Sequence, residues 1–354
     1  MEFDSRVRRY KNWSLITLIS LYLLVLIGGI VRSTGSGMGC PDWPKCYGYY
    51  IPPTKAEQLP SNYKEIYALK RQEKNIKIIK MLSYFHFNDL ASKLDSSDLK
   101  SAHSDDFNAT KTWIEYLNRL FGVLVGFSIL ILAFISIYFY KIDLVITLNT
   151  FLSLFLVILE GWIGSIVVST HLLPFTITIH MFLALAIIGI LIYNIFRAYR
   201  FISNIELVKS KFLLNFIIVL IILSAFQILL GSRVREQVDI IAQRFDYENR
   251  SLWIDFLGVI FYVHRSISIL ILILNLVFLY KINIALGTQS LVYKISLLFN
   301  FLLWSEVLLG VVMAYWSIPA FVQPLHLFVG ALVIGLQFSV LSIYLNSKNI
   351  LKIV

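Results

Sequence analysis

The sequence predicts an all-α integral membrane protein whose eight transmembrane helices form two tandem four-helix bundles related by a parallel pseudo-twofold repeat. Three observations lead to this fold class. The 354 residues are 58% hydrophobic and only 15% charged, whereas a soluble domain is about 45–50% apolar with roughly 25% charged residues. The apolar residues form eight runs of membrane length. Polar landmarks in the first four runs recur at a constant offset in the last four.

The first apolar run has the position of a signal peptide but not its other features. It has no A-x-A-like cleavage site and is longer than a typical h-region, so we expect a retained helix. Charged residues lie at the ends of most of the other apolar runs. The eight expected spans lie at about 14–32, 115–140, 143–168, 174–197, 212–232, 258–280, 291–313 and 320–345.

Basic residues are distributed unevenly between the two sides of these spans. Thirteen lie in or beside the two termini and the connections 141–142, 198–211 and 281–290, whereas the connections 169–173 and 314–319 carry none. By the positive-inside rule, both termini are predicted to be cytoplasmic, in a plasma-membrane protein. The thirteen are Arg6, Arg8, Arg9, Lys11, Lys141, Arg197, Arg200, Lys209, Lys211, Lys281, Lys294, Lys348 and Lys352. No expected helix combines a basic stripe with interleaved aromatics, so the net charge of +10 does not indicate nucleic-acid binding.

The internal repeat defines the expected domains. Asn118 and His264 are 146 residues apart, and the same offset relates Glu160 to Glu306, Gly164 to Gly310 and His180 to His326. An even number of spans in each half makes the repeat parallel. The predicted organisation is a cytoplasmic N-terminus at 1–13, a first bundle at 14–200, a linker at 201–211, a second bundle at 212–345 and a tail at 346–354.

The first bundle includes a long extracytoplasmic loop at 33–114. Within it, EIYALKRQEKNIKIIKMLSYF at 65–85 predicts a basic amphipathic helix that either lies on the membrane surface or extends the second span. The loop also holds the only two cysteines, Cys40 and Cys46. On the outer side of a membrane they can form a disulfide. The spacing leaves two roles open for this pair, a structural staple or a redox centre.

Three histidines fall inside apolar spans, where ionisable side chains usually face the bundle interior. His264 and His326 are at similar depth on helices of one half, close to the outer side, and His180 has the equivalent depth in the other half. Two neutral imidazoles facing across a bundle suit axial ligation of a haem iron. Zinc is the weaker alternative because no thiolate or carboxylate is in register to complete a tetrahedral set. A proton relay with Glu160 and Glu306 is a third interpretation.

Two arginines adjoin these landmarks, Arg119 after Asn118 and Arg265 after His264. Near a membrane boundary each could extend its guanidinium to the interface. Beside a haem, each could instead bind a propionate through a bidentate contact. The sequence does not separate these two roles.

With these residues in place, the sequence closely resembles the haem A synthase family over all eight spans. The resemblance is carried by GGIVRSTGSGMGCPDWPKCYG at 28–48, EYLNRLFG at 115–122, IH at 179–180, HRSIS at 264–268 and PLHLFVGA at 324–331. It implies an enzyme that oxidises the C8 methyl group of haem O to the formyl group of haem A. Two successive hydroxylations, followed by loss of water, supply haem A for cytochrome oxidase.

The resemblance also assigns residues. It implies that His264 and His326 are the axial ligands of a haem b cofactor and its iron, and that the substrate haem O lies between the positions of Asn118 and His180. It implies a catalytic role for Glu115, and a disulfide between the loop cysteines that passes reducing equivalents.

Two features depart from the family pattern. Asn118 stands where the family has a histidine, and an amide oxygen is a poor ligand for haem iron. The first-half iron should therefore be bound by His180 alone or by His180 and water. Glu160 and Glu306 stand where a neutral amide is expected, and a carboxyl group in a span costs about 2.5–3.5 kcal/mol on insertion scales.

Two other classes of protein compete with this interpretation. One is a membrane b-type cytochrome that only transfers electrons, and the other is a duplicated transporter whose histidines and glutamates carry protons. The expected partners are haem O, the lipid bilayer and an unidentified electron donor. The family further implies a haem O synthase and cytochrome oxidase assembly factors, and a homo-oligomer is compatible with the sequence.

Overall fold

The computed structural model describes residues 2–84, 86–89, 91–92, 94, 106–170, 174–203, 206–207, 209–245 and 248–349. Eight helices within these residues are long and apolar enough to cross a membrane. They are α1 (Glu2–Ser33), α4 (Ala109–Ser136, continued by the 3-10 turn η2, Ile137–Phe139), α5 (Leu144–Ser169), α6 (Pro174–Tyr199), α7 (Lys211–Arg244), α8 (Val259–Leu286), α9 (Leu291–Tyr315) and α10 (Val322–Asn346). This confirms the predicted all-α membrane fold, whereas the arrangement as two repeated bundles stays a prediction.

The chain divides into two compact units. One comprises Met1–Gly29, Val125–Val157 and Phe182–Val354, and the other comprises Ile30–Leu124 and Ile158–Met181. The first unit therefore contains α7 to α10 complete, together with most of α1 and parts of α4, α5 and α6. The second contains the long outer loop and the remaining parts of those helices.

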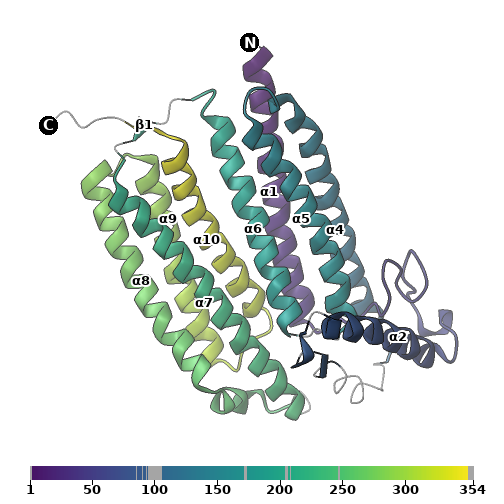
Figure 1. The fold of residues 1–354 in the computed structure, drawn as a ribbon. Coiled ribbons are helices and arrows are strands. Elements are labelled where there is room, and N and C mark those ends of the chain that lie inside the picture. The colour runs from purple at the N-terminus through teal and green to yellow at the C-terminus, as the bar shows by residue number, and fades with distance from the viewer. Residues whose placement is uncertain are drawn as a thin grey trace. The chain divides into compact units, whose positions relative to one another are not determined.

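In the first unit, α7, α8, α9 and α10 pack side by side (Figure 1). Their shared core is made of large apolar side chains such as Ile217, Phe278, Phe299 and Val340, none of which is exposed to solvent. The rings of Phe278 and Phe299 stack with their centroids 6.4 Å apart. Burial of this kind stabilises by about 1.5–3 kcal/mol for each large side chain relative to water, and interlocking shapes fix how the helices are rotated.

A buried polar cluster joins three other helices of the same unit. The Tyr10 hydroxyl of α1 lies 2.7 Å from the Thr150 hydroxyl of α5. The Asn194 side-chain amide of α6 donates to both hydroxyls at 3.2 Å. Because none of the three side chains is exposed, these hydrogen bonds satisfy groups that would otherwise be costly in an apolar interior.

Two helices in the first unit extend further than the apolar runs predicted. Helix α1 begins at Glu2 rather than near 14, and Val7 and Tyr10 on its first turns are buried. Helix α7 ends at Arg244 rather than near 232. Its last turns bury Val238, Ile241 and Ala242 against Trp253 of the 3-10 helix η3 (Arg250–Phe256). Hydropathy did not predict the first turns of α1 and the last turns of α7, because one face of the helix is polar in both places.

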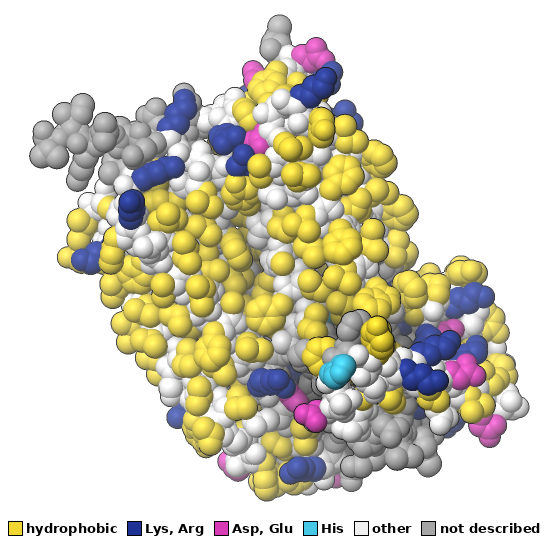
Figure 2. Space-filling model, viewed as in Figure 1, with side chains coloured by type: hydrophobic (Ala, Val, Ile, Leu, Met, Phe, Trp, Pro, Cys, Tyr) yellow, Lys and Arg dark blue, Asp and Glu magenta, His cyan; other side chains and the backbone are white. Residues whose placement is uncertain are grey.

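The connections of the first unit lie at its two ends. The connections before α5, after α6 and before α9 lie at the end where α1 begins, and the connections that follow α7 and α9 lie at the opposite end (Figure 1). Short strands β1 (Glu206–Leu207) and β2 (Lys348–Asn349) pair in parallel at the former end. Lys and Arg side chains gather near the helix ends, whereas hydrophobic side chains cover much of the helix flanks (Figure 2). This pattern is that of a multi-pass membrane protein.

The second unit contains the outer loop, folded around its cysteines. Cys40 and Cys46 form a disulfide with their Cα atoms 4.8 Å apart. Both cysteines pack with Tyr47, Leu59 and Tyr67 in a small buried cluster. Burial raises the pKa of the Tyr67 phenol to about 12, and the nearby Asp42 adds to the rise.

The basic segment of the loop forms a helix of its own, α2 (Tyr63–Tyr84), preceded by the short turn η1 (Ala56–Gln58). Helix α4 begins only at Ala109, so α2 is not an extension of the second span. The Tyr63 hydroxyl accepts a hydrogen bond from the Phe107 amide at 3.0 Å. An ion pair joins Lys64 to Asp106, and this lysine lowers the pKa of the Asp106 carboxyl.

Candidate functional site

Two of the predicted histidines face each other within the first unit. His264 lies near the start of α8 and His326 near the start of α10. Their ring centroids are 6.5 Å apart, and the ring planes are inclined by 74°. Each histidine lies one to two turns inside an apolar helix, so the pair forms a polar site among apolar side chains.

Glycines and one carboxyl group surround these rings. A Cβ atom added at Gly231 of α7 would lie 3.2 Å from Cε1 of His264, and one at Gly310 of α9 would lie 3.7 Å from Cε1 of His326. Gly231 therefore keeps room for the His264 ring, whereas a Cβ at 310 would be in ordinary van der Waals contact with His326. The Oε1 atom of Glu306 lies 3.1 Å from Nδ1 of His326. Gln227 donates from its side-chain amide to the backbone carbonyl of His264 at 2.9 Å.

A second histidine site lies in the second unit. Nδ1 of His180 on α6 is 3.2 Å from Oε1 of Glu160 on α5. A Cβ atom added at Gly164 would lie 3.4 Å from Cε1 of the same ring. Glu160 and Gly164, four residues apart on α5, therefore face a histidine of the next helix. Glu306 and Gly310 on α9 face His326 in the same way.

Asn118, the residue that replaces a family histidine, lies in the same unit as His180. Its side-chain oxygen is buried and has no hydrogen-bond partner among the described residues. No hydrogen bond joins Asn118 to His180 within the described part of the chain. The two residues predicted to flank the substrate therefore lie in one unit without a polar bond between them.

Glu115 and Arg119, also in the second unit, attach the cysteine loop to α4. Glu115 is only 3% exposed, and its Oε2 atom accepts a hydrogen bond from the backbone amide of Cys40 at 2.8 Å. Its other oxygen pairs with Arg119. The Arg119 guanidinium also donates to the carbonyls of Cys40 at 2.8 Å and Asp42 at 2.6 Å. The catalytic candidate is therefore bonded directly to the loop that carries the disulfide.

Gly39 makes this close approach of loop and helix feasible. A Cβ atom there would lie 2.6 Å from the backbone oxygen of Lys111 on α4, well inside van der Waals contact. The Thr112 hydroxyl donates to the Gly39 carbonyl at 2.9 Å. Any side chain at position 39 would therefore lift the loop away from the helix.

Arg265, the other candidate for a propionate contact, has a different environment. Its guanidinium lies over the Tyr262 ring, 5.5 Å from the centroid, and the residue is exposed. Arg119 and Arg265 are therefore not equivalent, although both follow a landmark residue directly. This difference was not predictable from the sequence, because it arises from the hydrogen bonds that Arg119 makes with the folded loop.

From the sequence, Glu160 and Glu306 were predicted only as departures from the family pattern and as members of an alternative proton relay. The structure places both against histidines. The signal was present in their common offset of 146 residues from each other and in the glycine four positions after each. Gln227 had no comparable signal.

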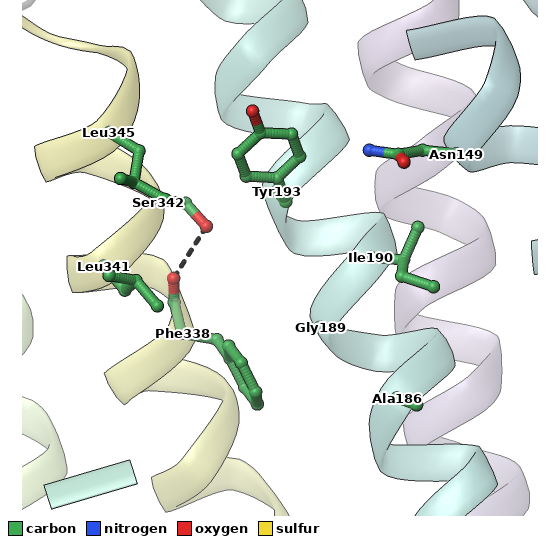
Figure 3. Close-up of a pocket in the computed structure, with 9 residues that line it drawn as sticks. All are labelled: Asn149, Ala186, Gly189, Ile190, Tyr193, Phe338, Leu341, Ser342 and Leu345. Carbon is green, nitrogen blue, oxygen red and sulfur yellow. Dashed lines mark hydrogen bonds between the residues drawn. The ribbon is translucent and has the colours of Figure 1, made fainter. Parts of the chain in front are cut away.

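A cavity of about 240 Å³ lies elsewhere in the first unit, between α5, α6 and α10 (Figure 3). It is lined largely by apolar side chains such as Ile190 and Phe338, and Ser342 within it donates to the Phe338 carbonyl at 2.7 Å. Phe338 is twelve residues beyond His326 on α10, which is about 18 Å along a helix. The cavity is therefore separate from the histidine pair.

Eight membrane-length helices with histidine and carboxyl side chains directed into their interior define a multi-pass membrane protein with a polar internal site. The family model for COX15-CtaA, described as a cytochrome oxidase assembly protein, matches residues 11–86 and 95–338. The chain belongs to this family.

Individual relatives carry one common name. The chain is 27% identical to a heme A synthase of Pelagibacter ubique over 372 aligned residues, which cover 98% of both proteins. It is 23% identical to a heme A synthase of Ehrlichia canis, covering 89% of this chain and 87% of the relative. A heme A synthase of a Wolbachia from Brugia malayi is 24% identical over 95% of this chain and 97% of its own length.

Proposed function

We propose that this protein is a haem A synthase, a membrane oxidoreductase that converts the C8 methyl group of haem O into the formyl group of haem A. Its family and the shared name of relatives that match nearly its whole length support this activity. The same comparisons do not favour a cytochrome that only transfers electrons. The observation that carries the proposal is the facing pair of His264 and His326, whose ring centroids are 6.5 Å apart.

The two imidazole rings lie close enough for both to reach one metal ion, with their centroids 6.5 Å apart. His264 and His326 would thus hold haem b, and a bound haem b supplies one-electron redox chemistry at this site. Gly231 leaves space beside the His264 ring that a side chain would narrow.

The substrate haem is assigned to the second unit. His180 binds its iron from one side, and Asn118 cannot replace the second imidazole. The unpartnered side-chain oxygen of Asn118 can accept a hydrogen bond from a bound water or from the substrate. Ligation by one histidine leaves room on the other side of the substrate iron, which an oxidation requires and bis-histidine ligation would block.

Glu115 is the proposed catalytic group of this half. Each of its carboxyl oxygens accepts one hydrogen bond from the protein, from Cys40 and from Arg119. Because a carboxylate oxygen has two acceptor positions, Glu115 can still hold or move a proton while the loop keeps it in place. The bonds that Glu115 and Arg119 make with the loop keep the Glu115 carboxyl group and the disulfide in fixed positions relative to each other.

The remaining assignments concern location and partners. The haem sites lie toward the outer side of a plasma membrane, with both termini cytoplasmic, because the basic connections lie at the opposite end of the spans. Haem O enters from the bilayer, a haem O synthase supplies it, and cytochrome oxidase assembly consumes the product. The Cys40–Cys46 disulfide, bonded through the Cys40 amide to Glu115, is the proposed entry point for electrons from a donor.

The test is expression in a host that provides haem O, followed by extraction of the pigments. We expect haem A or its hydroxylated intermediate, and a six-coordinate low-spin b-type spectrum from the purified protein. His264→Ala should abolish that spectrum. Glu115→Ala should lose haem A formation and keep haem b. If a competent host yields haem b protein without haem A or the intermediate, the protein is an electron-transfer cytochrome instead.

A further inference from the structure

Glu306 occupies a notch beside His326. Its Oε1 atom lies 3.1 Å from Nδ1 of that histidine, and a Cβ atom added at Gly330 would lie 3.2 Å from the same oxygen. Gly330 is one turn after His326 on α10, so the carboxyl group lies in a gap that any side chain at 330 would narrow. The side chains of Glu306 and His326 are only 20% and 22% exposed.

The distance is within hydrogen-bond reach, but the ring N–H is not yet aligned with the oxygen, and Nδ1 of His326 has no formed hydrogen bond among the described residues. Such contacts are often poorly aligned without a ligand and tighten when it binds.

An acceptor at Nδ1 decides the chemistry of the other nitrogen. The nitrogen that donates to the carboxyl keeps its hydrogen, so Nε2 presents its lone pair to a metal. A carboxyl partner also makes the imidazole a more basic ligand and favours the oxidised iron. An amide at the same position would supply the hydrogen bond but cannot ionise.

The opposite ligand candidate has no such partner. Within the described part of the chain, no carboxyl group lies within ion-pair distance of His264, and its Nδ1 atom is buried without a hydrogen bond. Its backbone carbonyl instead accepts a hydrogen bond from the Gln227 side chain at 2.9 Å. The two imidazoles that face each other are therefore held in different ways.

We propose that Glu306 is a positioning residue for His326: it accepts the Nδ1 hydrogen, fixes the plane of the ring and lowers the reduction potential of the haem b that His326 ligates. This rests on the proposed function, in which His264 and His326 hold haem b. Glu160 is the equivalent residue for His180 and acts on the substrate haem, since its oxygen lies 3.2 Å from Nδ1 of that ring.

The experiment compares Glu306→Gln, Glu306→Leu and Glu160→Gln in the full-length protein purified in detergent with its haem b. The readouts are the reduction potential of haem b from spectroelectrochemical titration, the low-spin electron paramagnetic resonance spectrum of the ferric form, and haem retention. Ring planes at 74° predict a strongly anisotropic low-spin signal in the unmodified protein. Glu160→Gln is the matched control, because it makes the same chemical change beside the other histidine.

We expect Glu306→Gln to keep its haem and raise the potential, because the acceptor is retained but can no longer carry a negative charge. Glu306→Leu should bind haem b about 10–100-fold more weakly and change the resonance spectrum. Glu160→Gln should leave the potential of haem b unchanged. An unchanged potential and spectrum in Glu306→Gln would overturn the inference, as would an equal shift in Glu160→Gln. Absence of haem b from the unmodified protein would instead refute the proposed function.

Discussion

Replacing Arg119 by methionine should release the cysteine loop from α4. Methionine keeps much of the length of the side chain but removes every donor. The guanidinium pairs with Glu115 and donates to the carbonyls of Cys40 and Asp42 at 2.8 and 2.6 Å. Its side chain is only 16% exposed, so solvent can replace little of what is lost.

The magnitude follows from these contacts. Hydrogen bonds from a charged donor contribute about 1.5–3 kcal/mol each, so the two short bonds together contribute roughly 3–6 kcal/mol. Leaving a buried ionic partner uncompensated, here Glu115, costs about 3–5 kcal/mol. The two effects describe the same rearrangement and do not add. We therefore expect a loss of about 4 kcal/mol in the free energy that holds the loop closed, or roughly a 10³-fold rise in its opening equilibrium.

Hydrogen exchange of the backbone amides of 39–49, followed by mass spectrometry, measures this opening directly. Alkylation of Cys40 and Cys46 under mild reducing conditions is an independent measure, since access to the disulfide requires the same opening. Arg265→Met is the matched control, because this arginine is exposed over Tyr262. The control should change loop exchange by less than about 0.5 kcal/mol.

Adding Glu115→Gln to Arg119→Met should restore part of the protection, because the uncompensated carboxyl is then neutral. The reasoning is refuted if loop exchange in Arg119→Met stays within about threefold of the unmodified protein, which is less than 1 kcal/mol. It is also refuted if the control opens the loop equally.

Three further predictions concern other parts of the molecule. Gly39→Ala should open the same loop, because its Cβ atom would lie 2.6 Å from a backbone oxygen of α4. The control Gly126→Ala, whose Cβ atom would have nothing within 4 Å, should be neutral or stabilise the helix by up to about 1 kcal/mol. Hydrogen exchange and thermal unfolding in detergent compare the two variants. Asp143→Asn should destabilise the first unit by about 3 kcal/mol, because this 3%-exposed carboxylate pairs with two arginines at 2.9 and 2.6 Å. Thermal unfolding measures the loss, and equal unfolding temperatures would contradict the prediction. Asn118→His should retain haem binding and reduce haem A formation, by adding a second ligand to the substrate iron; full turnover with an unchanged substrate spectrum would contradict this.

Hydropathy predicted the eight helices well because it measures a property that each helix has by itself. A run of about 20 apolar residues is unfavourable in water and on the surface of a small domain. Its insertion into a membrane can therefore be predicted without knowledge of the neighbouring helices. The prediction was poorer at helix ends. Val238 and Ile241 on the last turns of α7 are buried only because Trp253 covers them, and no windowed average contains that contact.

The long loop shows a similar division. Its cysteines and glycines indicated a turn and a disulfide, and the disulfide is present. That Glu115 and Arg119 fasten this loop could not be derived from their positions, because an i to i+4 ion pair on a helix normally stabilises that helix alone. The additional hydrogen bonds to Cys40 and Asp42 exist only once the loop is folded back over the helix.

By itself, the sequence determined that this protein is a multi-pass helical membrane protein, which of its residues resemble those of haem A synthases, and that histidines and glutamates recur at one offset. Only the tertiary structure decided that His264 and His326 face each other, that Glu306 lies against Nδ1 of His326, and that Arg119 holds a loop. The reason is physical. Composition and period fix what a helix is, whereas the atoms that meet depend on how each helix is rotated against its neighbours, and the packing of all the side chains sets that rotation.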